Sequence, residues 1–490
     1  MIIIIWTLAI GLAFLLYLKQ IYCYFSKHEI KSITPLPILG NMGKIVFKIN
    51  HFVDDISQLY NKFPEERFVG RYEFVNPVIY IRDIEIVKRI TIKDFEHFLD
   101  HRTIVNEETD PIFGRNLFSL KGQEWKDMRS TLSPAFTSSK MKLMMPLIVE
   151  VGEQMINALK KNIKNSGVGY VDIDTKDLTT RYANDVIASC AFGLKVDSLT
   201  EENNQFYAMG KAASNFSFKQ ILLLLGFISF PKLMKVRIRR KLVHDDKSSK
   251  DTDAGFATVE ESAVGKKQID RVWTDDDIIA QAVLFFVAGF ETVSSAMTFL
   301  LHELALNPEV QDKLVEEIKE NKERNNGKFD YNSIQNMVYL DMVVSELLRL
   351  WPPGVSMDRI CVQDYNLGKP NDKAKRDFTL RKGTGVAIPV WAFHRNPEFF
   401  PDPLKFDPER FSEENKHNIK PFAYLPFGVG PRNCIGSRFA LCEVKVMAYQ
   451  LLQHMEISPC EKTCIPSKLS KETFNLRLEG GHWVRLKIRD

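Results

Sequence analysis

The sequence predicts a mostly α-helical fold with a small β-sheet region to one side. Long stretches with the apolar period of helices dominate the chain, whereas strand-like runs are short and lie near its two ends. At 490 residues, with 45% apolar and 26% charged side chains, the chain has globular composition and enough length for a large core. No repeat or long linker follows residue 45, so we expect a single domain over 45–490.

The expected elements follow from this periodicity. Helices are predicted at 122–160, 175–192, 203–225, 274–305, 309–322, 333–350 and 435–454. Strands are predicted at 67–74, 77–83, 385–392 and 482–488. Thr274 is a candidate N-cap for its helix because Asp277 follows three residues later, and Asn307 with Pro308 marks the end of that helix. The polar stretch 241–272 is expected to be a loop.

The N-terminus differs from the rest of the chain in hydropathy. Residues 1–18 carry no charge, and such a run reaches across most of a bilayer core. Because no basic region precedes it and no clear cleavage site follows, we expect a transmembrane signal anchor rather than a cleaved peptide or a buried core helix. Lys19 and Lys27 follow, which favours a cytoplasmic position for the remainder. Residues 19–44 form a basic, proline-rich linker.

Charge and cysteine content exclude some functions. The net charge of +4 is too small to indicate nucleic-acid binding, and no basic run interleaved with aromatic residues occurs. Seven cysteines, an odd number without framework spacing, indicate a reducing compartment with mostly inert thiols. We therefore expect no nucleic-acid partner.

The stretch PFGVGPRNCIG surrounds one cysteine, Cys434, with unusual backbone freedom. Gly428, Gly430 and Gly436 would let the backbone curl around the sulfur and approach a flat partner closely. A thiolate in an apolar core needs positive potential, which backbone N–H groups and the start of the next helix can supply. Arg432 stands two residues away, where it could reach an anionic group. The pattern predicts a loop that surrounds a metal-bound thiolate beside a planar, carboxylate-bearing group such as haem.

An incidental cysteine in a glycine-rich turn is the alternative, and the longer pattern F-x-x-G-x-R-x-C-x-G argues against it. Phe427, Gly430, Arg432, Cys434 and Gly436 supply its defined positions. In this stretch the chain resembles the cytochromes P-450. The resemblance implies the cytochrome P-450 fold and a haem b group whose proximal iron ligand is Cys434.

Two further motifs carry the same resemblance. In SELLRL, Glu346 and Arg349 stand three apart on one helix face, flanked by apolar residues that favour a buried pair over a solvated one. FDPERF follows downstream, and the resemblance makes Arg410 the third member of a structural triad. On this interpretation the triad locks the scaffold of the cysteine loop and takes no part in the chemistry.

The stretch AGFETVSS lies inside the predicted helix 274–305. It places Glu291 beside Thr292, after Ala288 and Gly289, and a threonine here can bond back to the previous turn. The resemblance implies that Glu291 and Thr292 organise water and deliver protons to bound O2. Haem-thiolate isomerases and dehydratases need no such relay, so the pair favours a monooxygenase over those alternatives.

Haem carries two carboxylates, and buried carboxylates need counter-ions. EWKDMRSTLSPAF matches the W-x-x-x-R helix of the family, in which Trp125 and Arg129 would hold one propionate. Arg432, Arg102 and Arg359 are further candidates. For each arginine the alternative is a solvated surface position.

Around these motifs the sequence is most similar to insect microsomal members of the xenobiotic-metabolising clan. The resemblance implies a single-pass protein of the endoplasmic reticulum membrane with a cytoplasmic catalytic domain. It implies membrane lipid and a hydrophobic small molecule, either a xenobiotic or an endogenous lipid-like compound, as partners. Because no G-x-G-x-x-G follows a strand, electrons should come from NADPH through cytochrome P-450 reductase, with cytochrome b5 as a second candidate donor.

Two residue sets are expected to meet these partners. Candidate substrate-pocket residues are Phe285, Phe286, Ala288, Gly354, Val355 and the hairpin tip at Gly480 and Gly481. A cationic surface facing the reductase is expected from Lys121, Lys126, Lys140, Arg438 and Lys445. For this surface, scattered solvated cations are an equally weighted alternative.

One region departs from the family pattern. After 215–235 the chain runs almost directly into the polar stretch 241–272, so the second helix of the substrate lid is expected to be missing. Lid closure gates chemistry in many enzymes. The alternative function is therefore a haem-binding but catalytically impaired variant.

Overall fold

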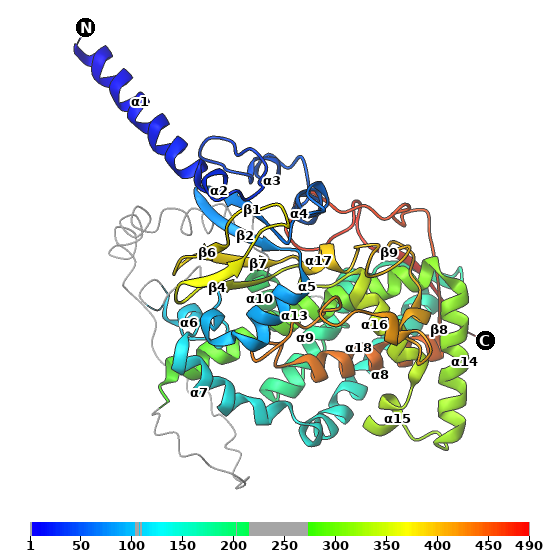
Figure 1. The fold of residues 1–490 in the computed structure, drawn as a ribbon. Helices are drawn as coiled ribbons and strands as arrows, with labels where there is room; N and C mark the ends of the chain where they lie inside the picture. Colours follow the sequence, from blue (N-terminus) through cyan, green and yellow to red (C-terminus); the bar gives the residue numbers. More distant parts are fainter. Residues whose placement is uncertain (1, 103–106, 108–109, 202, 215–272, 490) are drawn as a thin grey trace.

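The computed structural model confirms a mostly helical fold with small sheets (Figure 1). The structure describes residues 2–102, 107, 110–201, 203–214 and 273–489. The second half of the predicted helix 203–225, the predicted loop 241–272 and the site of the expected missing lid helix lie outside the described residues.

The long helices form the body of the molecule. They are α7 (Gly122–Leu132), α8 (Ser138–Ser166), α9 (Thr175–Phe192), α10 (Gln205–Ser214), α13 (Asp275–Leu306), α14 (Pro308–Arg324), α16 (Val338–Leu350) and α18 (Ser437–His454). Shorter helices are α2 (Tyr24–Lys27), α3 (Gly43–Val46), α4 (Phe52–Lys62), α5 (Ile84–Lys88), α6 (Pro111–Gly114), α15 (Tyr331–Gln335) and α17 (Val390–Phe393).

Helix α13 runs through the centre and packs against α9, α16 and α18. It begins with the predicted capping box, in which the Thr274 hydroxyl accepts from the Asp277 N–H while the Asp277 carboxylate accepts from the Thr274 N–H. From Val293 to Ala305 its residues are buried in the main core. The half before Val293 is less buried, which leaves it available to line a cavity.

Two predicted helices are interrupted. The predicted helix 122–160 divides into α7 and α8 at a 3-10 turn, Ser133–Phe136, because Pro134 lacks the N–H that a continuous helix requires. The predicted helix 333–350 divides into α15 and α16. The separation leaves α16 to present its own buried face.

The structure has three small sheets, of which the first and third share one core cluster and the second packs among the helices of the main core. The first has the order β1 (Phe68–Glu73), β2 (Asn76–Ile81), β7 (Gly385–Ile388), β4 (Met357–Ile360), with β2 and β7 parallel. The second has the order β3 (Tyr170–Asp174), β9 (Trp483–Ile488), β8 (Met455–Ser458), and the third pairs β5 (Tyr365–Gly368) with β6 (Phe378–Leu380). The predicted strand 385–392 ends early because Pro389 precedes α17 and cannot donate to the ladder.

Helix α1 (Ile2–Tyr22) projects away from the body (Figure 1). Apolar side chains along most of α1 are exposed, and the helix is long and apolar enough to cross a membrane. Helix α13 also passes that test, but half of its most apolar window is buried inside the protein. The candidate membrane anchor is therefore α1, and α13 is the core helix.

Candidate functional site

A largely apolar cavity of about 450 Å³ lies between the first half of α13 and the loop before α18. Helix α13 contributes Phe285, Ala288 and Thr292 to its lining, and the loop contributes Phe427 and Cys434. Residues of α7, α16, α18 and β4 also line it. The cavity thus brings together segments that are far apart in the sequence.

The cysteine loop is shaped by its backbone. The Cys434 N–H donates to the Phe427 carbonyl at 2.9 Å, and the Asn433 N–H donates to the Gly430 carbonyl at 3.0 Å. Gly428 and Gly430 have φ of 71° and 78°, which only glycine adopts readily. A Cβ on Gly430 would lie 2.0 Å from the Thr91 carbonyl oxygen. This close approach holds the loop against the segment that follows α5.

Gly436 has a different role from the other two glycines. It is the N-cap of α18, with φ of −91°, so it needs no left-handed backbone. Its N–H hydrogen-bonds the Cys434 sulfur. The expectation that Gly436 supplies conformational freedom is therefore corrected, and its contribution is an N–H directed at the sulfur.

The Cys434 thiol faces the cavity and is exposed to it. Burial raises the pKa of Cys434, while the Gly436 N–H and the nearby Arg129 guanidinium oppose that rise. Ionisation of such a thiol is favoured when a metal cation coordinates the sulfur. The donor set therefore suits a cation bound on the cavity side.

Two arginines line the cavity near the sulfur. Arg129 donates to the Asn433 carbonyl and side-chain oxygens, both at 2.8 Å. Arg359 is 2% exposed and donates to the Asp358 carbonyl, but its buried Nε has no hydrogen-bond partner among the described residues. Burial lowers the pKa of Arg359. An unsatisfied guanidinium in a cavity wall fits an anionic ligand group.

Arg432 also lines the cavity, but its donors are largely committed to the protein. It donates to the carbonyl oxygens of Leu99, Leu117 and Leu120 at 2.8, 3.3 and 2.8 Å. Its guanidinium stacks 4.0 Å from the ring centre of Trp125, which is buried in the same wall. Burial lowers the pKa of Arg432 to about 9. These contacts fix the wall through backbone bonds.

Arg102 is not among the described residues that line the cavity, so its contact with a ligand carboxylate stays a prediction. Its guanidinium donates to the Glu73 carboxylate at 2.6 Å. Sequence reasoning missed His101 and Asp358, which do line the cavity and bond each other at 3.0 Å. No local motif marks this pair, because its members are distant in the sequence.

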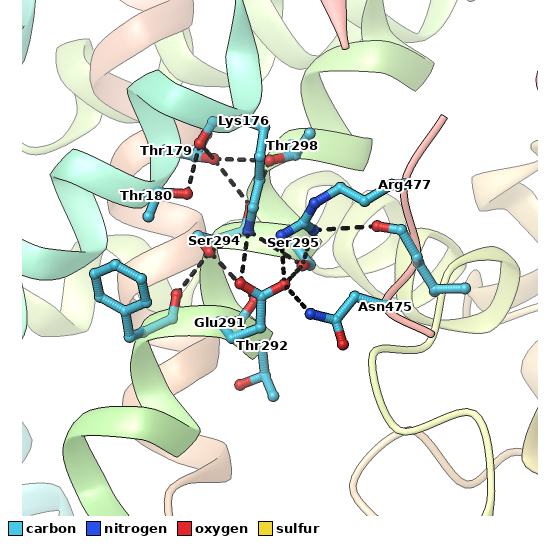
Figure 2. A network of polar contacts seen from close by, with 12 residues as sticks. Lys176, Thr179, Thr180, Glu291, Thr292, Ser294, Ser295, Thr298, Asn475 and Arg477 are labelled. Atoms are coloured by element: carbon cyan, nitrogen blue, oxygen red, sulfur yellow. Dashed lines mark hydrogen bonds and ion pairs between the residues drawn. The ribbon is translucent and has the colours of Figure 1, made fainter. Parts of the chain in front are cut away.

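Glu291 and Thr292 are adjacent in α13 but point in different directions (Figure 2). The Thr292 hydroxyl donates to the Ala288 carbonyl at 2.6 Å, the back-bond expected from the sequence, and Thr292 lines the cavity. Glu291 does not line it. One helical step of about 100° separates the two side chains, so the alcohol faces the cavity while the acid faces α9 and the C-terminal segment.

Glu291 is held by two cations, and we call Glu291, Lys176 and Arg477 the α13 cluster. Arg477 Nη2 lies 2.7 Å from Glu291 Oε1, and Lys176 Nζ lies 3.4 Å from Oε2. Asn475 and Ser295 donate to Oε1 at 3.2 Å each. Figure 2 shows these side chains converging on the carboxylate.

Glu346, Arg349 and Arg410 also lie together, and we call them the scaffold cluster. Arg349 bonds both Glu346 carboxylate oxygens at 2.6 and 2.8 Å, and both side chains are fully buried. Arg410 Nε lies 3.5 Å from Glu346. Burial raises the pKa of Glu346, and the surrounding donors oppose that rise.

His394 links the scaffold cluster to the cysteine loop, and sequence reasoning missed it. Its Nδ1–H donates to the Arg349 carbonyl at 3.0 Å, and its Nε2 accepts from the Leu425 N–H at 2.8 Å. Burial lowers the pKa of His394 to about 3, so the ring is neutral at physiological pH. Leu425 in turn accepts from the Gly428 N–H in the cysteine loop.

The candidate substrate residues divide into two groups. Phe285, Ala288 and Gly354 line the cavity. Phe286 does not, because it packs against Phe206 and Phe290. Val355 and the Gly480–Gly481 tip are also outside the lining formed by the described residues. An apolar pocket is therefore present, but only Phe285, Ala288 and Gly354 of the candidate residues line it among the described residues.

Taken together, the fold and this site define a class of protein: a helical protein with one cysteine facing an apolar cavity whose wall carries arginines. A family model described as cytochrome P450 matches residues 30–483. The chain belongs to the cytochrome P450 family.

Several curated insect proteins are similar over nearly their whole length. Cytochrome P450 9e2 of Blattella germanica is 44% identical, with 99% of this chain and 98% of that protein covered. Probable cytochrome P450 9f2 of Drosophila melanogaster is 39% identical, with 95% of each covered. Cytochrome P450 6j1 of Blattella germanica is 35% identical, with 98% of this chain and 96% of that protein covered.

Membership of the family makes this chain a haem monooxygenase and implies a haem iron with a cysteine thiolate ligand. The described residues fit that group, since a thiol, an unsatisfied guanidinium and apolar walls share one cavity.

The alignment with Cytochrome P450 9e2 runs over 527 positions, more than the 490 residues of this chain. That relative therefore has residues at positions where this chain has none.

Proposed function

We propose that Cys434 is the thiolate ligand of haem b and that the protein oxidises a hydrophobic small molecule, with electrons from NADPH. The observation that carries the proposal is the position of Cys434 in the wall of an apolar cavity that also contains Thr292 and unsatisfied Arg359. When bound, the haem supplies the redox chemistry by which one atom of O2 enters the substrate and the other becomes water.

The cations of the cavity wall would hold the haem carboxylates. Arg359 is the first candidate because its Nε lacks a partner among the described residues, and Arg129 is the second because it lines the cavity beside the cysteine loop. Trp125 and Arg432 support the same wall through their stacking contact.

The Gly436 N–H stabilises the ionised sulfur of Cys434, and Phe427 positions the loop through its carbonyl.

Thr292 and Glu291 would serve proton delivery from different sides of α13. The Thr292 hydroxyl faces the cavity and donates its proton to the Ala288 carbonyl, from which it could reorient toward a water in the cavity. Glu291, which faces away from the cavity, would supply the protons that Thr292 passes on. This pair favours a monooxygenase over a haem-thiolate isomerase or dehydratase.

The substrate is proposed to be apolar and either a xenobiotic or an endogenous lipid-like compound. Phe285, Ala288 and Gly354 offer it apolar or small surfaces without a charged anchor. The xenobiotic alternative is an analogy that rests on similarity to insect proteins such as Cytochrome P450 9e2. The name of that relative specifies no substrate.

Electrons are proposed to arrive through cytochrome P-450 reductase, with cytochrome b5 as a second donor, at the endoplasmic reticulum membrane. Helix α1 would be the single-pass anchor that leaves the catalytic domain in the cytoplasm. The proposed cationic surface loses Lys445, which is buried and pairs with Asp341. Lys126 pairs with Glu96. Lys121, Lys140 and Arg438 remain as candidates.

A catalytically impaired haem protein is the second candidate function. The observation that favours it is the alignment with Cytochrome P450 9e2, which extends over more positions than this chain has residues. We propose that the missing residues belong to the second lid helix. Loss of such a helix would affect water exclusion more than haem binding.

The test combines a spectrum with turnover. We expect the reduced, carbon-monoxide-treated protein to show a thiolate-type Soret band that Cys434→Ser abolishes. The matched control Cys464→Ser changes a different, only partly buried thiol and should retain the band. A band that persists in Cys434→Ser would disprove the ligand assignment. A normal band without NADPH-driven turnover would favour the impaired variant.

A further inference from the structure

The α13 cluster contains a cation that sequence reasoning did not find. Lys176 lies in the first turn of α9, and its ammonium reaches across to α13. It donates to the Ser294 hydroxyl at 2.6 Å and to the Ser295 hydroxyl at 3.3 Å, besides lying 3.4 Å from Glu291. Its side chain is 12% exposed. Lys176 therefore connects two helices behind the cavity-lining face of α13.

Arg477 approaches the same carboxylate from the C-terminal segment. Besides its 2.7 Å contact with Glu291, it donates to Ser295 at 3.2 Å. Two cations from outside α13 thus share one carboxylate and one hydroxyl. Besides the Ser295 hydroxyl of α13, the partners of Glu291 come from other elements, and Figure 2 shows its carboxylate turned toward them and away from Thr292.

The two cations differ in chemistry. A guanidinium gives up its proton much less readily than an ammonium, and a buried ammonium can lose its proton near neutrality. Burial lowers the pKa of Lys176 to about 7, and repulsion from Arg477 adds to this, while Glu291 and Asp174 oppose it. Near pH 7 the cluster can therefore exist with either one or two positive charges.

Several titratable groups face Lys176 and set this balance. They are Glu291 of α13, Arg477 and His482 of the C-terminal segment, and Asp174 at the end of β3, while His302 of α13 in turn faces His482. The pKa values of His302 and His482 are lowered, chiefly by burial, so both rings are neutral near pH 7. Lys176 is consequently the member of this group whose charge changes in that range.

We propose that Lys176 and Arg477 are positioning residues for Glu291, and that Lys176 gives oxygen activation by this enzyme its pH dependence. With Lys176 protonated, two cations fix the Glu291 carboxylate; after proton loss, Arg477 alone holds it with the neutral donors. This inference rests on the proposed role of Glu291 in proton delivery. It predicts that the fraction of NADPH electrons that reaches product falls as pH rises through about 7.

The first experiment measures product and hydrogen peroxide per NADPH between pH 6 and pH 9. The full chain with reductase is compared with Lys176→Met, Lys176→Arg and the control Lys195→Met, which removes an exposed lysine paired with Glu150. We expect Lys176→Met to lower the coupled fraction about tenfold, the low end for outer-shell partners, and to abolish the inflection. Lys176→Arg should keep the low-pH fraction throughout, and the control should follow the wild type.

The second experiment does not depend on turnover. A base whose pKa is lower in the folded protein makes folding more favourable as pH rises, here between about 7 and 10.5. We expect the free energy of unfolding of the wild type to rise over this range relative to that of Lys176→Met. An equal pH dependence in both proteins, or an inflection in coupling that survives in Lys176→Met, would overturn the proposal.

The two experiments also separate this proposal from the proposed function. Loss of the thiolate-type band in Cys434→Ser concerns the haem ligand and does not bear on Lys176. If the unfolding data show that Lys176 titrates near neutrality but coupling does not follow, Glu291 is positioned without serving proton delivery, and the functional part of this inference is wrong.

Discussion

The scaffold cluster and the α13 cluster have the same composition in outline, since each consists of one carboxylate and two cations. In the scaffold cluster both cations are arginines, and Glu346 with Arg349 is completely buried. In the α13 cluster one cation is a lysine, and 19% of the Glu291 side chain is exposed. Similar charges can thus form either a fixed support or an adjustable site.

The difference lies in how the remaining donors are used. Arg349 also donates to the carbonyl oxygens of His394, Pro403 and Lys405, at 2.7, 2.8 and 3.2 Å. The scaffold cluster therefore binds backbone from several segments and cannot rearrange without breaking them. In the α13 cluster Lys176 bonds serine hydroxyls, which rotate at little cost. Rigid partners make one cluster structural, and mobile partners make the other responsive.

The largest expected effect breaks the scaffold cluster. Arg349→Met leaves the buried Glu346 carboxylate uncompensated and should lower the free energy of unfolding by about 3–5 kcal/mol. Denaturant unfolding checks this, with Lys313→Met as control because it removes an exposed ion pair with Glu409. That control should cost no more than about 1 kcal/mol. Equal losses in the two variants would show that the buried cluster is not the support we describe.

An intermediate effect is expected from Glu291→Gln in the α13 cluster. The amide keeps the shape of the side chain but cannot take up and release a proton. The rate of product formation should therefore fall roughly 100-fold. Thermal stability and the carbon-monoxide band should change little, since Glu291 is only partly buried. Product formation per enzyme is the measurement. A loss of the band together with the rate would place Glu291 in the structural class with Glu346.

The smallest effect is expected from Arg410→Met. Arg410 lies 3.5 Å from Glu346, and its Nε makes no hydrogen bond among the described residues, although Nη2 donates to the Asp402 carbonyl at 2.9 Å. We expect a loss of about 1 kcal/mol in the free energy of unfolding. A loss as large as that of Arg349→Met would mean that the two arginines contribute equally.

The sequence predicted those parts of the molecule whose chemistry is local. The capping box of α13, the Thr292 back-bond and the glycine conformations at 428 and 430 each depend on neighbouring residues. The bounds of α9 and α13 were predicted to within one residue for the same reason. Continuous apolar patterns and short motifs suffice where no distant partner decides the geometry.

Partners that are distant in the sequence were predicted poorly. Lys176 and Arg477 reach Glu291 from separate elements, and no pattern around either one indicates this. The ion pair of Arg102 with Glu73 joins residues that are likewise distant in the sequence, and no local pattern indicated it. Lys445 was predicted to be a surface cation, yet its side chain is buried. In each case tertiary packing, rather than local preference, selects the partner.

The close approach at Gly430 has a consequence for engineering. Any side chain at that position would collide with the Thr91 carbonyl oxygen, so a mutational library has no room for variation there. At Gly436 the nearest atom to an added Cβ is 3.7 Å away and φ is negative, so alanine can be accommodated. Two glycines of one motif therefore differ in tolerance, and attempts to retune the sulfur should begin at the second.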